Sequence, residues 1–126
     1  MSGKIVHFEI PADDLDRAKS FYTEAFGWTL TDYPGLDYTG VTTTPVDDSM
    51  MPTEPGAING GMTSRSAPVT SVTITVGVDD IDEALAKVKQ AGGTVVQTKQ
   101  AVADMGFTGY FTDTEGNTIG LWQNAS

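Results

Sequence analysis

The residue types best suited to chemistry lie in one short segment near the start of the chain. His7, the only histidine, precedes Glu9 by two residues within an alternation of polar and apolar residues. Successive side chains of a β-strand point to opposite faces, so His7 and Glu9 share one face. Such a pair could supply a general base, orient a ligand or give two donors to a divalent metal. A simpler interpretation is a pocket histidine whose pKa is raised by hydrogen bonding to Glu9.

The elements that position these two residues occur twice in the chain. The segment 7–28, HFEIPADDLDRAKSFYTEAFGW, is matched by the segment 73–94, TITVGVDDIDEALAKVKQAGGT, at a constant offset of 66 residues. At this offset the polar positions of the first strand correspond to Thr73 and Thr75. An even offset keeps the faces of the two strands in phase. We therefore expect two copies of one supersecondary unit.

The first copy reads as a strand, a helix and three further strands. Asp13 or Asp14 is expected to cap the helix, and Gly27 to end it in a left-handed conformation. The expected strands span residues 4–10, 28–33, 37–44 and 57–63. The long connection before the last strand contains Met50-Met51-Pro52, which could form a lid over an apolar pocket or a plain mobile loop.

The second copy follows the same order. Asp80 and Glu83 are expected to begin its helix as a capping box, and Gly92-Gly93 to end it. Its expected strands span residues 71–78, 94–98, 108–112 and 118–123, with a loop at 102–107 and a hairpin turn at 113–117. The sequence thus predicts an α+β fold, in which paired βαβββ units form a curved mixed sheet around a concave cup.

The alternation along the strands predicts which residues face this cup. The apolar positions that should pack against the helices are Val6, Phe8, Ile10, Val72, Ile74 and Val76. The polar faces would then line the cup. We expect its ligand-binding residues to be His7, Glu9, Thr73, Thr75, Tyr110, Gly120 and Trp122.

Length and composition predict one compact domain. The 126 residues would form a single domain of two units, at about 3–64 and about 70–124. The net charge of −10 argues against nucleic acid and anionic membranes as partners. With no cysteine, no disulfide or thiolate metal site can form. No apolar run long enough to span a bilayer and no leader segment are visible, so we expect a cytoplasmic protein.

Three motifs together carry a family resemblance. HFEIPADDLDRAKSFYTEAFGW, VDDIDEALAKVKQAGG and TDTEGNTIGLWQ resemble the vicinal oxygen chelate superfamily. That superfamily includes glyoxalase I, the bleomycin and fosfomycin resistance proteins and the extradiol dioxygenases. The chain is most similar to its small bacterial glyoxalase-related proteins, and the resemblance covers nearly everything except residues 45–56. Because one fold can support many reactions, the resemblance predicts the fold but not one particular function.

The resemblance implies where a metal would bind. In metal-dependent members the first and last strand of each unit offer one ligand apiece to a divalent ion such as Ni²⁺, Zn²⁺, Mn²⁺ or Fe²⁺. His7 matches the first of these positions, but Thr73 and Gly120 occupy two others and cannot replace a histidine or a carboxylate. The last position falls at Asn59, Gly60 or Gly61. If a metal is bound at all, His7 and Glu9 are its candidate ligands, fewer than a catalytic site normally has.

Three functions are compatible with these residues. The first is metal-free binding of a small molecule, with polar contacts from His7 and Glu9, apolar contact from Trp122, and His7 as the catalytic candidate. The second is a metal-dependent lyase or isomerase resembling lactoylglutathione lyase, with a thiol-conjugated α-ketoaldehyde as substrate. The third is a non-enzymatic interaction module. The resemblance also implies a homodimer, with units paired either within or between chains.

Overall fold

The computed structural model describes residues 3–35 and 37–125. By their internal contacts these residues divide into two compact units. The first unit spans His7–Val72. The second begins at Thr73 and also includes the start of the chain through Val6. No helix in the described part of the chain is long and apolar enough to cross a membrane.

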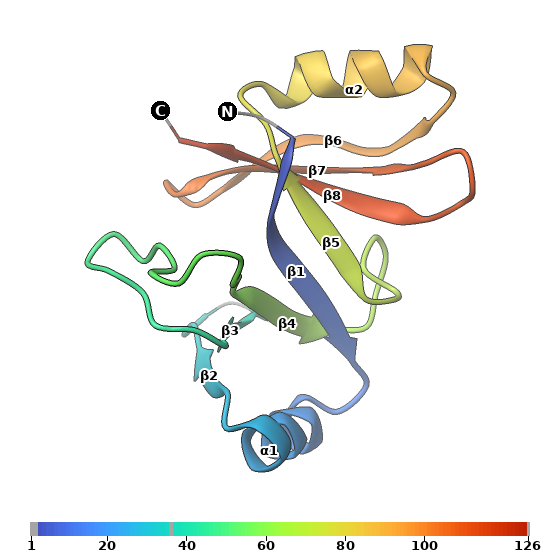
Figure 1. The fold of residues 1–126 in the computed structure, drawn as a ribbon. Helices are drawn as coiled ribbons and strands as arrows, with labels where there is room; N and C mark the ends of the chain where they lie inside the picture. Colours follow the sequence, from blue (N-terminus) through green and yellow to red (C-terminus); the bar gives the residue numbers. More distant parts are fainter. Residues whose placement is uncertain (1–2, 36, 126) are drawn as a thin grey trace. The chain divides into compact units, whose positions relative to one another are not determined.

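The first unit is a four-stranded sheet covered by one helix (Figure 1). Its elements are β1 (Lys4–Ala12, in this unit from His7 onward), α1 (Leu15–Phe26), β2 (Thr29–Asp32), β3 (Thr39–Thr42) and β4 (Gly60–Ser64). The strands lie in the order β2-β3-β4-β1. β1 runs parallel to β4, and the other neighbours are antiparallel.

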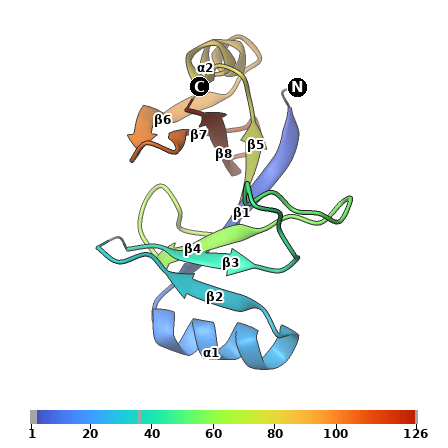
Figure 2. The same ribbon diagram turned by 90° about the vertical axis from the view of Figure 1, so that its left-hand side faces the viewer.

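The second unit repeats this arrangement. Its elements are β5 (Thr73–Gly77), α2 (Ile81–Gln90), β6 (Thr94–Val102), β7 (Gly106–Thr112) and β8 (Thr118–Asn124). The strand order is β5-β8-β7-β6, with β5 parallel to β8 and the other pairs antiparallel. Each unit is therefore a βαβββ motif, and the predicted α+β fold is confirmed (Figure 2).

An aspartate side chain caps the N-terminus of each helix, at equivalent positions in the two units. Asp14 Oδ1 accepts a hydrogen bond from the backbone N–H of Arg17 at 3.0 Å. Asp80 Oδ1 accepts one from the backbone N–H of Glu83 at 3.1 Å. These bonds satisfy helix N–H groups that lack an intrahelical partner. Gly27 ends α1 with φ 72°, in the left-handed conformation that the sequence predicted.

Each unit has its own apolar core. In the first unit Met62 and its buried neighbours pack against Phe8 and Ile10 of β1 and against residues of α1. In the second unit Leu121 and two α2 residues pack against Val76 of β5. The helix-facing role of Phe8, Ile10 and Val76 is thus confirmed. Helix and sheet are held together in both units mainly by burial of these apolar side chains.

The predicted packing of the apolar strand face against the helix is wrong around the beginning of β5. Val72 and Ile74 were expected to pack against α2, but they are 67% and 40% exposed. α2 lies over β6, β7 and β8, so it does not cover the first residues of β5. Val6, in the corresponding position of β1, is likewise exposed. Thr73 and Thr75 on the opposite face are buried.

One loop differs from the predicted one. β6 continues to Val102 and β7 begins at Gly106, because these two residues are paired across the hairpin. The predicted loop 102–107 is therefore a tight turn. In the 45–56 segment Asp47 Oδ1 accepts hydrogen bonds from the backbone N–H groups of Ser49 and Met51, at 2.8 and 3.1 Å. Residues 47–51 thus form a hydrogen-bonded turn within the segment, and its role as a lid or as a plain loop stays a prediction.

Candidate functional site

The candidate site of the first unit is built on the polar face of β1. His7 is half-buried, and its Nε2 lies 3.3 Å from the hydroxyl oxygen of Tyr38. Either ring tautomer can make this contact, because the tyrosine hydroxyl both donates and accepts. His7 and Tyr38 are 31 residues apart in the sequence, so the contact is a product of the fold.

Burial keeps the His7 imidazole neutral. It lowers the pKa of His7 from 6.5 to about 4, because desolvation disfavours the charged form. The expectation that Glu9 would raise this pKa is therefore wrong. The hydrogen-bond partner of the ring is an uncharged hydroxyl, which does not favour the imidazolium as a paired carboxylate would.

Tyr38 remains protonated beside it. Burial, followed by the negative charge of Glu9 and the neighbouring Tyr33, raises the pKa of Tyr38. The rings of Tyr33 and Tyr38 stack with centroids 5.6 Å apart. We call His7, Glu9, Tyr33 and Tyr38 the His7 cluster. It offers a neutral imidazole, a phenol and a carboxylate on one unit.

Gly61 makes room for this cluster. It pairs with Glu9 across the β1–β4 ladder. A side chain at this position would overlap the Tyr38 ring, so the absence of a Cβ allows Tyr38 to lie across β4. The two tyrosines were missed by the sequence analysis. The available signal was Gly61 itself, since a glycine inside a strand often marks the close approach of another group.

The second unit brings together three of its predicted site residues. Thr75 pairs with Gly120 across the β5–β8 ladder, and Gly120 pairs with Tyr110 on β7. A Cβ at Gly120 would lie 2.9 Å from Thr75 Oγ1 and 3.3 Å from the Tyr110 ring. Thr73 is buried two residues before Thr75 on the same strand. Trp122 is half-buried on β8.

The ladder pairs Glu9–Gly61 and Thr75–Gly120 occupy equivalent places in the two units. Gly61 is thus the counterpart of Gly120. Asn59, another candidate for this position, has a structural role, because its Oδ1 accepts the backbone N–H groups of residues 43 and 44 at 2.7 and 3.1 Å.

These residues do not fit a divalent metal site. Across residues 3–35 and 37–125, no three histidine, aspartate or glutamate side chains gather closely enough to hold a metal ion. In the first unit His7 and Glu9 come from one strand, and Gly61, the ladder partner of Glu9, has no side chain to add. In the second unit the corresponding pair, Thr75 and Gly120, offers only a hydroxyl. A catalytic zinc-type site usually has three protein ligands.

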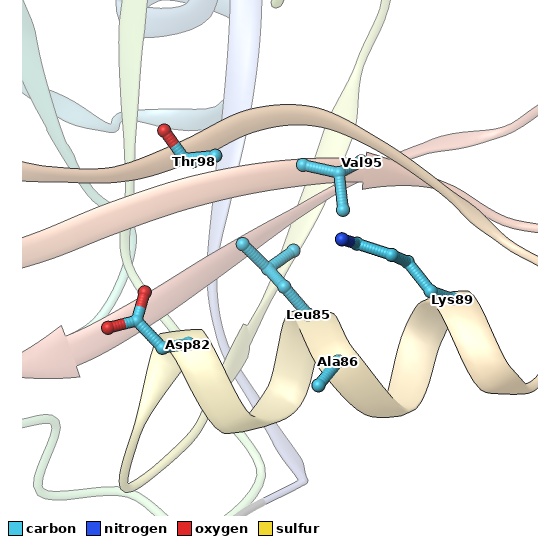
Figure 3. Close-up of a pocket in the computed structure, with 6 residues that line it drawn as sticks. All are labelled: Asp82, Leu85, Ala86, Lys89, Val95 and Thr98. Atoms are coloured by element: carbon cyan, nitrogen blue, oxygen red, sulfur yellow. The ribbon is translucent and has the colours of Figure 1, made fainter.

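A separate small depression lies on the second unit, between α2 and β6 (Figure 3). Its volume is about 190 Å³. Asp82 and Lys89 are at its two ends, with Leu85 and Val95 between them. It contains none of the residues predicted to bind a ligand, and both charged side chains are ordinary for the exposed face of a helix.

Comparison with known proteins agrees with this architecture. A sequence profile for the glyoxalase/bleomycin resistance protein/dioxygenase superfamily matches residues 4–121. The chain belongs to this superfamily. Putative glyoxylase CFP32 of Mycobacterium tuberculosis is 32% identical over 120 residues, covering 91% of this chain and 43% of CFP32. The chain therefore spans less than half the length of that relative.

Two further known proteins match over nearly the whole of both chains. A probable lactoylglutathione lyase of Vibrio parahaemolyticus is 31% identical, with 98% of this chain and 92% of that protein covered. Among solved structures, a single-residue variant of Streptomyces coelicolor methylmalonyl-CoA epimerase in complex with 2-nitronate-propionyl-CoA has a TM-score of 0.67 at 17% identity. The match covers 100% of this chain and 97% of the epimerase. At that identity the likeness shows the shared fold alone.

Proposed function

We propose that this chain binds a small organic molecule on the polar face of β1, through the His7 cluster and without a divalent metal. The observation that carries the proposal is the 3.3 Å contact between a half-buried, neutral His7 and the protonated Tyr38. Burying polar groups costs folding free energy unless they are hydrogen-bonded. A partly buried face that combines an imidazole, a phenol and a carboxylate is therefore expected to serve a function.

The chemistry of the cluster favours a ligand with both donors and acceptors. Neutral His7 can donate or accept, Tyr38 can donate its hydroxyl proton, and Glu9 is an acceptor when ionised. A carbonyl or hydroxyl compound matches this combination. His7 would act on it as a hydrogen-bonding group or as a general base, since a neutral imidazole can take up a proton.

The absence of a metal in this proposal rests on the donor set. Gly61 and Gly120 occupy the closing-strand positions of the two units, and neither has a side chain. A metal held by His7 and Glu9 alone would lack the third protein ligand of a typical catalytic site.

A ligand screen read through the single histidine tests the proposal. The His7 ring resonance would be followed while S-lactoylglutathione and a panel of α-hydroxycarbonyl compounds are added. A binding compound should shift this resonance, and Tyr38→Phe should raise its dissociation constant about tenfold by removing one hydrogen bond. Tyr22→Phe is the matched control, because Tyr22 belongs to α1 and stacks on Trp28. A screen in which no compound shifts the resonance contradicts the proposal and favours an interaction module.

A metal-dependent lyase is the second candidate. It is favoured by the 31% identity to the probable lactoylglutathione lyase of V. parahaemolyticus along nearly its whole length. The assay is turnover of the hemithioacetal of methylglyoxal and glutathione, with and without added Ni²⁺ or Zn²⁺. Turnover that requires the metal and disappears in His7→Ala would replace metal-free binding as the assigned function.

We further propose that the protein is a cytoplasmic homodimer. The resemblance noted from the sequence motifs supports this assembly. Light scattering should give twice the 13.3 kDa mass of one chain. A mass equal to that of one chain contradicts the dimer.

A further inference from the structure

A second depression lies on the first unit and contains no residue of the His7 cluster. It has a volume of about 340 Å³ and lies beside the end of β1 and one face of α1. The residues that matter for its chemistry are Asp13, Asp14, Arg17, Phe21, Tyr22 and Arg65, which we call the arginine groove. Small-molecule sites commonly have volumes of roughly 300–1,000 Å³.

The groove collects both arginines of the chain. Arg17 and Arg65 are the only arginines in a sequence with a net charge of −10. They are 48 residues apart in sequence (65 minus 17), yet both line this one depression. The two guanidinium groups balance the charges of Asp13 and Asp14, so this depression lacks the strong negative charge of the chain as a whole.

The two arginines are not equally engaged. Arg65 donates from Nε to Asp13 Oδ1 at 2.8 Å and from Nη1 to the backbone oxygen of Thr70 at 2.9 Å. These bonds fix its guanidinium beside the groove. Arg17, by contrast, makes no side-chain hydrogen bond or ion pair with any residue in the ranges 3–35 and 37–125. Its five N–H donors are therefore available to a ligand.

An aromatic wall completes the groove. Phe21 meets Tyr22 edge-on, with centroids 5.0 Å apart and planes at 85°. Tyr22 in turn stacks on Trp28 at 4.8 Å. Phe21 is nevertheless 58% exposed, so much of its ring surface meets solvent. A flat apolar group that packs on the ring would bury this surface.

We propose that the arginine groove binds a small aromatic carboxylate. The carboxylate pairs with Arg17 and with the remaining donors of Arg65, and the ring of the ligand packs against Phe21. Guanidinium groups match the planar geometry of a carboxylate. A single negative charge suits the site better than a phosphate does, because Asp13 and Asp14 line the same depression and repel additional charge.

Three probes separate the contributions of charge and ring. The protein is titrated with 3-phenylpropionate, with its neutral isostere 3-phenylpropanamide, and with phenyl phosphate, while backbone amide shifts are followed by NMR. We expect 3-phenylpropionate to shift the amides of Arg17 and Phe21, and to bind at least about tenfold more tightly than the amide. Phenyl phosphate is expected to bind more weakly than 3-phenylpropionate.

Variants then locate the site. Arg17→Gln should weaken 3-phenylpropionate binding about tenfold, and Phe21→Ala several-fold. Both side chains are exposed, so neither change removes part of the core. Lys89→Gln is the matched control, since it removes one exposed positive charge from the depression on the second unit.

Several results would overturn the proposal. These are no amide shifts at millimolar 3-phenylpropionate, equal affinity for the neutral amide, and an unchanged affinity in Arg17→Gln. An equal loss in Lys89→Gln would show that only net charge matters. Tighter binding of phenyl phosphate would overturn the assignment of the ligand as a carboxylate.

Discussion

Burial of His7 predicts that acidification from pH 7 to pH 5 destabilises the protein. The pKa of His7 is about 4 in the folded chain, against 6.5 for an unperturbed histidine. Between pH 6.5 and about pH 4 the unfolded chain therefore binds a proton that the folded chain does not. Stability rises with pH wherever the unfolded state holds more protons, so this contribution is complete above pH 6.5 and declines as the pH falls toward 4.

The size of the effect follows from these two pKa values. Between pH 7 and pH 5 the linkage amounts to about 2 kcal/mol of unfolding free energy, given a folded-state pKa of about 4. Urea denaturation at the two pH values measures it. His7→Gln removes the titrating group but keeps a polar side chain, so the drop should be about 2 kcal/mol smaller in this variant.

A direct titration checks the cause. His7 is the only histidine, so untagged protein gives a single set of imidazole resonances. Their midpoint should lie near pH 4. A midpoint at or above 6.5, or an equal pH dependence of stability in wild type and His7→Gln, would refute the conclusion that desolvation dominates the His7 environment.

Three further predictions concern packing and turns. Met62→Ala should lower the unfolding free energy by about 2–5 kcal/mol, because Met62 is 0% exposed. Met51 is exposed, so Met51→Ala should change the unfolding free energy by less than about 0.5 kcal/mol. Equal effects of the two substitutions in urea denaturation would contradict the assigned core. Gly120→Glu should lower the melting temperature without creating a Ni²⁺ site, because a Cβ at this position would lie 2.9 Å from Thr75 Oγ1. A stable variant that binds nickel in a calorimetric titration would contradict this prediction. Asp113→Ala should lower the melting temperature at neutral pH, because hydrogen bonds from the 113–117 turn hold the pKa of Asp113 below 3.8. The difference in melting temperature between wild type and variant should shrink as the pH falls below that value, and a difference that stays constant with pH would contradict this prediction.

Much of the fold was predictable because it depends on local signals. The constant offset between the two copies indicated a repeated unit, and Asp14 and Asp80 cap helices by reaching only three residues along the chain. Phe8 and Ile10 pack against the helix as the alternation of β1 predicted.

The site was less predictable because its contacts are not local. The His7–Tyr38 contact joins residues far apart in sequence and depends on the missing side chain of Gly61. The pKa of His7 is set by desolvation, which depends on everything packed around the ring. Ile74 was assigned to the core by alternation, but the placement of α2 leaves it exposed.

The proposed function requires that the His7 cluster bind its ligand without a metal. The most direct test is elemental analysis of untagged protein, together with thermal melting of wild type and His7→Ala in the presence of Ni²⁺, Zn²⁺, Mn²⁺ or Fe²⁺. A ligand that binds the folded chain raises its melting temperature by mass action. We expect a substoichiometric metal content and no metal-dependent stabilisation that requires His7. A near-stoichiometric metal, or a rise in melting temperature that disappears in His7→Ala, would contradict the claim and assign His7 to a metal site.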